Sequence, residues 1–267
     1  MVTDPAPDPD SPWEPPGPPP APAHATPYLR ETLDTLTLHF SGSEIQSRMQ
    51  LGQPDTLSLA YTRLMMGFLA FVPRPRRLAL LGLGGGSLAK FCHRHLPAST
   101  ALTVVEVNPH VIALREAFHI PPDGPRFRVV EADAAHFVAD TGERFDVLMV
   151  DAFDETGMPP HLGTLRFYGD CLDVLAAAGL MVVNLHSGHP HHALYVDRLR
   201  GVFGADAVLE VPDPGGSNSV VFAAKAPAGP MARAAAGRAR RPEGLSVAAW
   251  TQLAPAFAII ASARARA

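Results

Sequence analysis

The sequence Arg77-Leu-Ala-Leu-Leu-Gly-Leu-Gly-Gly-Gly-Ser87 is a short apolar run that ends in a cluster of glycines. Apolar residues continue beyond it at helical spacing, so the pattern predicts a strand, a glycine-rich turn and a helix. Glycine adopts backbone conformations that a Cβ forbids, and it lets amide N–H groups approach a ligand closely. We therefore expect a ligand-binding turn made by Gly82, Gly84, Gly85 and Gly86.

A second apolar stretch, Leu102-Thr-Val-Val-Glu-Val107, follows after about 20 residues and places an acid at the end of a predicted strand. The Glu106 carboxylate can accept hydrogen bonds from both hydroxyls of a ribose. The turn and the acid together indicate a nucleoside-containing ligand. Because the turn reads Gly82-x-Gly84-x-x-Ser87 and lacks the last glycine of the dinucleotide fingerprint, a tight turn without a ligand is the alternative.

The composition indicates a globular α/β protein with appendages. Of the 267 residues 47% are hydrophobic, and no apolar run approaches the ~18–20 residues that cross a bilayer. The N-terminus is rich in Pro and Asp, unlike a secretory signal. Cys92 and Cys171 fall in predicted helices, which favours buried, reduced thiols in a cytoplasmic protein, with a single disulfide as the alternative.

The formal net charge of −4 is unevenly distributed along the chain. Residues 226–267 contain six Arg and one Glu, so the remainder is more acidic than the total suggests. An acidic body favours a cationic small-molecule partner, and we expect neither a nucleic-acid nor a membrane partner. Four parts are expected: a disordered Pro-rich tail at 1–27, a small β element with an apolar helix at 28–72, a nucleoside-binding catalytic domain at 73–225, and an Ala/Arg-rich linker with a C-terminal helix at 226–267.

Strands and helices alternate through the central part of the chain. Five strands are each followed by a helix, and two terminal strands have no helix between them, which predicts an antiparallel hairpin. The pattern predicts the α/β class, with a seven-stranded, doubly wound, mostly parallel sheet of the S-adenosylmethionine-methyltransferase-like Rossmann type. The terminal hairpin argues against an NAD-linked dehydrogenase. The expected strands are 78–83, 102–107, 127–131, 145–151, 179–185, 207–211 and 219–224, preceded by two short strands at 35–40 and 44–51 and a helix at 57–72.

Acidic side chains follow three of the predicted parallel strands, at the edge of the sheet where ligands bind. Asp133 can accept a hydrogen bond from an adenine amino group, or it can cap the following helix, and the two roles are compatible. Asp151 and Asp154 lie three residues apart at the mouth of the fourth strand. One could receive a proton from an amine nucleophile while the other anchors a distal ammonium; a solvated acidic loop is the alternative.

Several motifs of this chain resemble the polyamine aminopropyltransferases, the spermidine synthase family. The resemblance covers about residues 40–225 and rests on these segments: Leu80-Leu-Gly-Leu-Gly-Gly-Gly-Ser87, Val104-Val-Glu-Val107, Glu131-Ala-Asp-Ala134, Phe145-Asp-Val-Leu-Met-Val-Asp-Ala-Phe-Asp154, Arg166-Phe-Tyr-Gly-Asp170 and Ala178-Gly-Leu-Met-Val-Val-Asn184. It implies transfer of an aminopropyl group from decarboxylated S-adenosylmethionine to putrescine or a related polyamine, without a metal. It also implies a tendency to form homodimers.

The same resemblance implies roles for individual residues. Glu106 would hold the ribose, Asp133 and Ala134 the adenine, and Asp151 would be the catalytic acid/base. Asp154 would anchor the substrate, and Gln46, Tyr61 and Ser87 would border the aminopropyl and amine pocket.

The chain departs from the family mainly in the amine half of the site. Ser87 replaces an Asp that contacts the amine, Arg63 replaces an acid after Tyr61, and the segment at 212–217 lacks a Tyr. Fewer acids and an added cation should weaken binding of a dication. Two alternatives therefore stay open: a methyltransferase that uses S-adenosylmethionine, and a non-catalytic nucleoside-binding relative.

Overall fold

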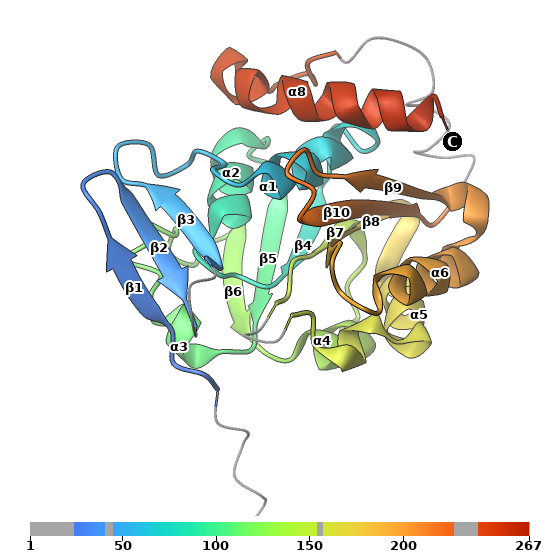
Figure 1. Cartoon of the computed structure of the whole chain (residues 1–267), viewed down its shortest axis with the longest axis horizontal. Coiled ribbons are helices and arrows are strands. Elements are labelled where there is room, and N and C mark those ends of the chain that lie inside the picture. Colours follow the sequence, from blue (N-terminus) through green and yellow to red (C-terminus); the bar gives the residue numbers. More distant parts are fainter. Residues whose placement is uncertain (1–23, 41–44, 154–156, 227–239, 267) are drawn as a thin grey trace, which may run out of the picture.

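The computed structural model describes residues 24–40, 45–153, 157–226 and 240–266 (Figure 1). Within these residues, two sheets make up the β structure. A three-stranded antiparallel sheet near the N-terminus contains β1 (Tyr28–Glu31), β2 (Thr35–His39) and β3 (Ser47–Gln50). The seven-stranded sheet contains β4 (Arg77–Leu81), β5 (Ala101–Glu106), β6 (Phe127–Glu131), β7 (Phe145–Val150), β8 (Leu175–His186), β9 (Val208–Pro212) and β10 (Asn218–Ala224).

The larger sheet has the order β6-β5-β4-β7-β8-β10-β9. The first five strands pair in parallel, and β10 pairs antiparallel with both β8 and β9. The predicted fold class is therefore confirmed, including the terminal hairpin. The strand order reverses between β4 and β7, and in open α/β sheets such a switch point opens a crevice at the carboxyl ends of the strands.

Helices cover both faces of this sheet (Figure 1). Along β4, Leu78 and Leu80 join one apolar core, whereas Ala79 and Leu81 join the other, because successive side chains of a strand point to opposite faces. One face is covered by α1 (Ala60–Met65), η1 (Met66–Ala70), α2 (Ser87–His95) and α8 (Val247–Arg264). The other face is covered by α4 (Ala134–Asp140), α5 (Leu165–Val174) and α6 (His192–Phe203). Three short helical segments lie in connections: α3 (Pro109–Ile112), η2 (Pro160–Gly163) and η3 (Ala205–Ala207).

The predicted boundaries differ from the observed ones at several elements. β1 was missed, because all four of its residues are exposed and carry no alternating pattern. The helix expected at 57–72 is split into α1 and the 3-10 helix η1, where Gly67 lets the chain pack closely against Ile260 of α8. The short helix α3 is capped by the Asn108 side chain and ends at Ile112, after which the chain continues as turns.

Two further sequence questions have answers in the structure. Cys92 and Cys171 are buried and free, so they do not form the disulfide that the sequence left open. Among the helices of the described residues, none combines the length and apolarity needed to span a membrane.

Candidate active site

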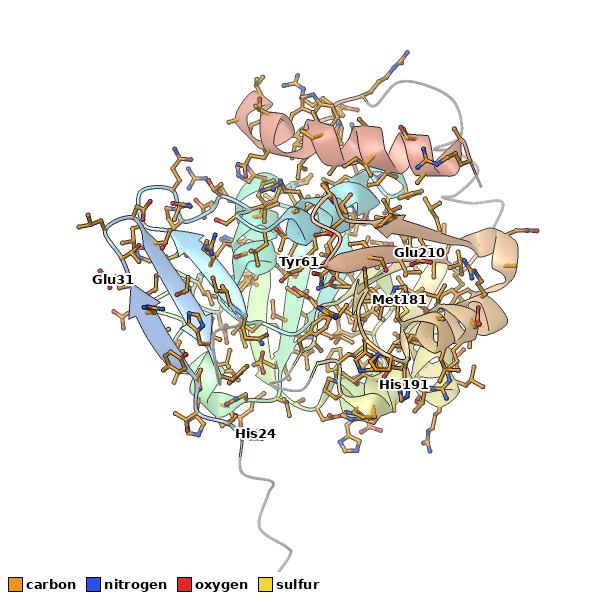
Figure 2. The ribbon with its side chains drawn as sticks, viewed as in Figure 1. His24, Glu31, Tyr61, Met181, His191 and Glu210 are labelled. Atoms are coloured by element: carbon orange, nitrogen blue, oxygen red, sulfur yellow. The ribbon has the colours of Figure 1, made fainter. Side chains whose placement is uncertain are left out.

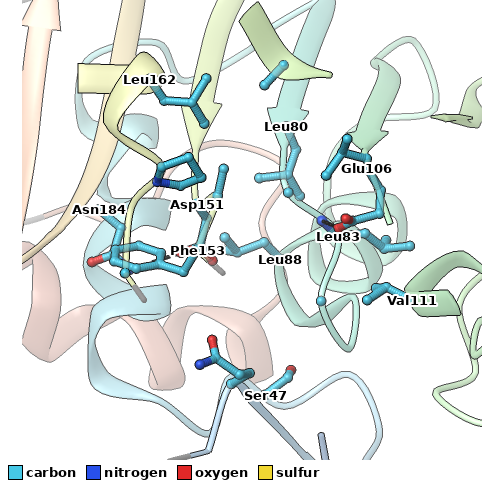
Figure 3. A pocket seen from close by; sticks show the side chains of 18 of the residues that line it. Ser47, Leu80, Leu83, Leu88, Glu106, Val111, Asp151, Phe153, Leu162 and Asn184 are labelled. Atoms are coloured by element: carbon cyan, nitrogen blue, oxygen red, sulfur yellow. Dashed lines mark hydrogen bonds between the residues drawn. The ribbon is translucent and has the colours of Figure 1, made fainter. Parts of the chain in front are cut away.

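A cavity of about 440 Å³ opens at the switch point between β4 and β7 (Figure 3). Strand register explains the convergence: Leu81 pairs with both Val105 and Val150, so Gly82, Glu106 and Asp151 follow at the same level on three adjacent strands. The N-terminal sheet and α1 close the opposite side. Of the sequence-predicted site residues, the following line the cavity: Gln46, Tyr61, Gly82, Gly84, Ser87, Glu106, Asp133, Ala134 and Asp151.

Gly82 brings the backbones of two neighbouring strands into close contact. It has a φ of 100°, and a Cβ at this position would lie 2.2 Å from the backbone oxygen of Asp151. Gly85 and Gly86 are not among the described residues that line the cavity. A Cβ on Gly85 would lie 2.5 Å from Ser47 Oγ, and one on Gly86 would lie 2.5 Å from Ile120 Cγ1. These two glycines therefore let neighbouring segments pack, and their expected ligand contact is not seen in the cavity lining.

Glu106 is held rigidly at one side of the cavity. Its Oε2 accepts a hydrogen bond from the Leu83 N–H at 2.9 Å, and its Oε1 accepts one from the Asn108 N–H at 3.0 Å. Each carboxylate oxygen keeps a second lone pair. The two oxygens can therefore accept from a pair of neighbouring hydroxyls while the backbone fixes their orientation.

Asp133 caps the following helix, which is one of the two roles predicted for it, and it also lies at the cavity, while its contact with an adenine stays a prediction. Its Oδ1 caps α4 by accepting from the N–H groups of Ala135 and His136, while its side chain lines the cavity. Its Oδ2 lies 3.0 Å from His161 Nε2. Partial burial opposes ionisation, but the hydrogen bonds from His136 N–H and His161 outweigh it, so the pKa of Asp133 lies below its usual range.

Asp151 lies on the other side of the cavity from Glu106, beside Asn184 (Figure 3). Its Oδ2 accepts from the Tyr61 hydroxyl at 3.3 Å, and its Oδ1 accepts from Asn184 Nδ2 at 2.9 Å. Burial raises the pKa of Asp151 to about 6, and the hydrogen bonds from Asn184 and Tyr61 limit the rise. Burial and the neighbouring carboxylate also raise the pKa of Tyr61. A carboxylate with this pKa is ionised at neutral pH and can accept a proton.

Some cavity residues were not predicted. Asn184 was noted only as part of the motif at 178–184. Its contact with Asp151 depends on the pairing of β8 with β7. His161, His186 and His189 also line the cavity and were not among the predicted site residues. Two histidines that follow shortly after His189 lie elsewhere: His191 is beside the start of α6 (Figure 2), and His192 Nε2 lies 2.8 Å from Ser219 Oγ. The described residues contain no group of three or more His, Cys, Asp or Glu that could hold a metal ion.

The structure places Arg63 away from the cavity. Arg63 donates a hydrogen bond to the Leu57 carbonyl and is not among the described residues that line the cavity, whereas Tyr61 is. Residues two apart on a helix point in different directions, so Arg63 does not bring its charge to the amine side of the site. Ser87 does line the cavity. Asp154 lies outside the described residues, and its expected role stays a prediction.

Comparison with known proteins identifies the family. A family model for the spermine/spermidine synthase domain matches residues 58–202, more than half of the chain. The chain belongs to the spermine/spermidine synthase family. The resemblance predicted from the motifs is thereby confirmed. The region matched by the family model contains Tyr61, Glu106, Asp133, Asp151 and Asn184. Most of the cavity is therefore built from the family's domain.

Relatives of this spermine/spermidine synthase family member have similar sequences and folds. The polyamine aminopropyltransferase of Neisseria meningitidis is 37% identical over 189 residues, covering 70% of this chain and 71% of the relative. That of Chromobacterium violaceum is 38% identical over 188 residues, with the same shares. Among solved structures, a probable spermidine synthase from Corynebacterium glutamicum has a TM-score of 0.65 at 24% identity, covering 77% of this chain and 81% of its own. Human methyltransferase-like protein 13, in complex with SAH, has a TM-score of 0.56 at 20% identity, covering 76% and 93%. At such identities these structures show a shared fold.

Proposed function

We propose that this protein transfers an aminopropyl group from decarboxylated S-adenosylmethionine to a polyamine such as putrescine. The observation that carries the proposal is Asp151, a carboxylate with a raised pKa, held by Tyr61 and Asn184 in the same cavity as Glu106. The relatives named polyamine aminopropyltransferase support it. The non-catalytic alternative is less favoured, because a raised pKa on a positioned carboxylate is typical of an acid/base group.

The reaction needs a nucleoside held at one side and an amine freed of its proton at the other. Glu106 would accept from the ribose hydroxyls, and Asp133 with Ala134 would contact the adenine. Asp151 would take a proton from the ammonium, so that the nitrogen lone pair can attack the carbon attached to the sulfonium. The new C–N bond forms as the C–S bond breaks, and the electron pair stays on sulfur in 5′-methylthioadenosine. The negative charge of Asp151 also favours a cationic sulfonium nearby.

The amine half of the cavity fits a polyamine acceptor as a class. Gln46, Tyr61 and Ser87 line the cavity and would border its amine half, and Asp154 would anchor a distal ammonium. Because Arg63 points to the Leu57 carbonyl, it does not oppose a dication there. Ser87, where the family resemblance implies an acid, is the departure that raised the methyltransferase alternative, and the relatives named polyamine aminopropyltransferase do not favour that alternative.

The direct test is turnover with putrescine and decarboxylated S-adenosylmethionine, followed by release of 5′-methylthioadenosine and the mass of the amine product. The proposal predicts a product heavier by one aminopropyl group. A methylated amine formed only with intact S-adenosylmethionine would favour the methyltransferase. Calorimetric binding of 5′-methylthioadenosine without turnover of any amine would favour a non-catalytic protein.

The pKa of Asp151 predicts how turnover depends on pH. The carboxylate acts as a base only when ionised, and burial raises its pKa to about 6. On the acid side of the pH–rate profile, we expect kcat/KM to fall about tenfold per pH unit below that value and to level off above it. A pH–rate profile between pH 5 and 8 checks this. A flat profile across the range would remove Asp151 from the role of base.

Glu106→Gln is expected to weaken 5′-methylthioadenosine binding about 10–100-fold, because an amide cannot accept from both backbone N–H groups and two hydroxyls. Isothermal titration calorimetry measures the affinity. Glu131→Gln is the matched control: Glu131 pairs with Glu106 across β5 and β6 but is exposed. Equal affinity in the Glu106→Gln protein and the wild type would show that the nucleoside binds elsewhere.

A further inference from the structure

Two asparagine side chains stand in line behind Asp151. Asn218, the first residue of β10, donates from Nδ2 to Asn184 Oδ1 at 2.9 Å. Asn184, on β8, donates from its own Nδ2 to Asp151 Oδ1 at 2.9 Å. Residues from three strands, the farthest of them 67 positions apart in sequence, therefore form one chain of hydrogen bonds that ends on the carboxylate.

The two hydrogen bonds run in one direction, from the Asn218 Nδ2 donor through the Asn184 amide to the Asp151 carboxylate. A side-chain amide has a donating end and an accepting end, and Asn184 is almost fully buried, with 2% of its surface exposed. Because Asn218 supplies a donor to Asn184 Oδ1, the Asn184 Nδ2 group must face Asp151. The reverse orientation would place two acceptors against each other at Asp151 and two donors against each other at Asn218.

The backbone fixes Asn218 in place. Its N–H donates to Asp213 Oδ1 at 3.3 Å, and its carbonyl accepts from the Asp213 N–H at 2.8 Å, across the turn between β9 and β10. In the ladder between β8 and β10, Asn218 pairs with His186 and Asn184 pairs with Val220. Asn218 and Asn184 are thus diagonal neighbours on one face of the sheet, within reach of each other.

We propose that Asn218 is a positioning residue for the proposed transfer: it orients the Asn184 amide so that Asp151 Oδ1 receives a hydrogen-bond donor and the carboxylate stays ionised. This inference rests on the proposed function for its catalytic meaning, although the orientation itself does not depend on it. Asn218 acts through Asn184 and needs no contact with the reacting atoms.

Other groups that face the cavity must be considered with Asp151. Tyr61 approaches from α1 and donates to the other carboxylate oxygen. His186 and His189 line the cavity at the end of β8 and just beyond it, and Glu106, Asp133 and His161 line it from neighbouring segments. A change at Asn218 leaves the residue types of all these groups unchanged, so a shift in the titration of Asp151 can be assigned to the asparagine chain.

Asn218→Asp reverses the polarity of the chain. A carboxylate at this position only accepts, so Asn184 would turn its Nδ2 toward residue 218 and its Oδ1 toward Asp151. The protonated form of Asp151 would then be stabilised, because only a protonated carboxyl group can donate a hydrogen bond to the Asn184 Oδ1 that faces it. We expect its titration midpoint to rise by about one pH unit or more, so that kcat/KM falls nearly tenfold below pH 6 and changes little at pH 9. Ser217→Ala, at the exposed neighbouring residue, is the control and should match the wild type at every pH.

A double-mutant cycle distinguishes an effect transmitted through Asn184 from direct charge repulsion between residue 218 and Asp151. If Asn218 acts through Asn184, the shift caused by Asn218→Asp disappears when Asn184 is replaced by Ala. Persistence of the full shift in that background would overturn the proposal. Asn218→Leu, which removes the donor without adding charge, should shift the midpoint in the same direction but less, and it covers the case in which Asn218→Asp does not fold.

The decisive measurement does not require turnover. Titration of aspartate carboxyl carbons by 13C NMR reports the Asp151 midpoint directly, with the signal assigned from its loss in Asp151→Asn. An unchanged midpoint in both Asn218→Asp and Asn218→Leu overturns the proposal. A wild type that turns over no amine would instead reject the proposed function, while the NMR shift would still decide the orienting role of Asn218.

Discussion

Asp151→Asn is expected to lower kcat about 10²–10⁴-fold while leaving 5′-methylthioadenosine binding nearly unchanged. The amide has the size of the carboxylate and can keep its contacts with Tyr61 and Asn184, but it cannot accept a proton from the amine. Steady-state kinetics and calorimetry measure the two quantities. Asp140→Asn, at an exposed residue near the end of α4, is the matched control and should keep full activity.

The same substitution should stabilise the protein at neutral pH, which separates lost chemistry from lost folding. The pKa of Asp151 rises from 3.8 to about 6 on folding, so the folded state binds its proton more tightly. Stability therefore falls as pH rises from about 4 to about 6, and the cost is fully present above that range. Allowing for water in the cavity, the cost is roughly 1–3 kcal/mol. Asp151→Asn should raise the melting temperature at pH 8 and not at pH 4. A variant that is fully active, or less stable at pH 8, would contradict this account.

Gly82→Ala is expected to destabilise the protein by more than about 3 kcal/mol and to abolish turnover. An alanine at a φ of 100° is strained, and its Cβ would lie 2.2 Å from the Asp151 carbonyl oxygen. The Asp151 oxygen belongs to the backbone, and the backbone fixes the position of a Cβ, so no side-chain rotation relieves the contact and β4 and β7 must separate where the cavity opens.

Chemical denaturation and the turnover assay check this expectation. Gly142→Ala is the matched control, because a Cβ there meets no atom within 4 Å and Gly142 is not among the described glycines with a positive φ. The control should stay within about 1 kcal/mol of the wild type. A soluble Gly82→Ala protein with normal melting and turnover would show that the close approach is not required.

The apolar pattern was sufficient to predict the large sheet. Its parallel strands are buried on both faces and appear as short continuous apolar runs, as at 78–81 and 147–150. Parallel strands end at a common edge, so the acids that follow them, Glu106, Asp133 and Asp151, were expected to converge, and they do line one cavity. β1 lacked such a signal because its four residues are exposed, and its pairing with β2 holds it in place.

The Arg63 side chain lies away from the cavity for a reason that helical periodicity explains, and its effect on dication binding stays a prediction. Arg63 and Tyr61 are two residues apart in α1, and such residues point to different sides of a helix. Adjacency in the motif was read as adjacency in the site. The histidines that line the cavity were not among the predicted site residues, because the order of residues does not show that His161, His186 and His189 reach the same opening as Asp151.

The chemistry at the edge of the sheet follows from residue types in order along the chain: a glycine turn, an acid for the ribose, and a carboxylate where the fourth parallel strand ends. The hydrogen-bond partners of Asp151 do not follow from this order. Tyr61 and Asn184 reach it, and Asn218 reaches Asn184, only after α1, β8 and β10 have packed around β7. Strand periodicity sets the edge at which a side chain emerges, whereas the protonation of a carboxylate depends on burial and on donors from distant segments, which packing alone brings together.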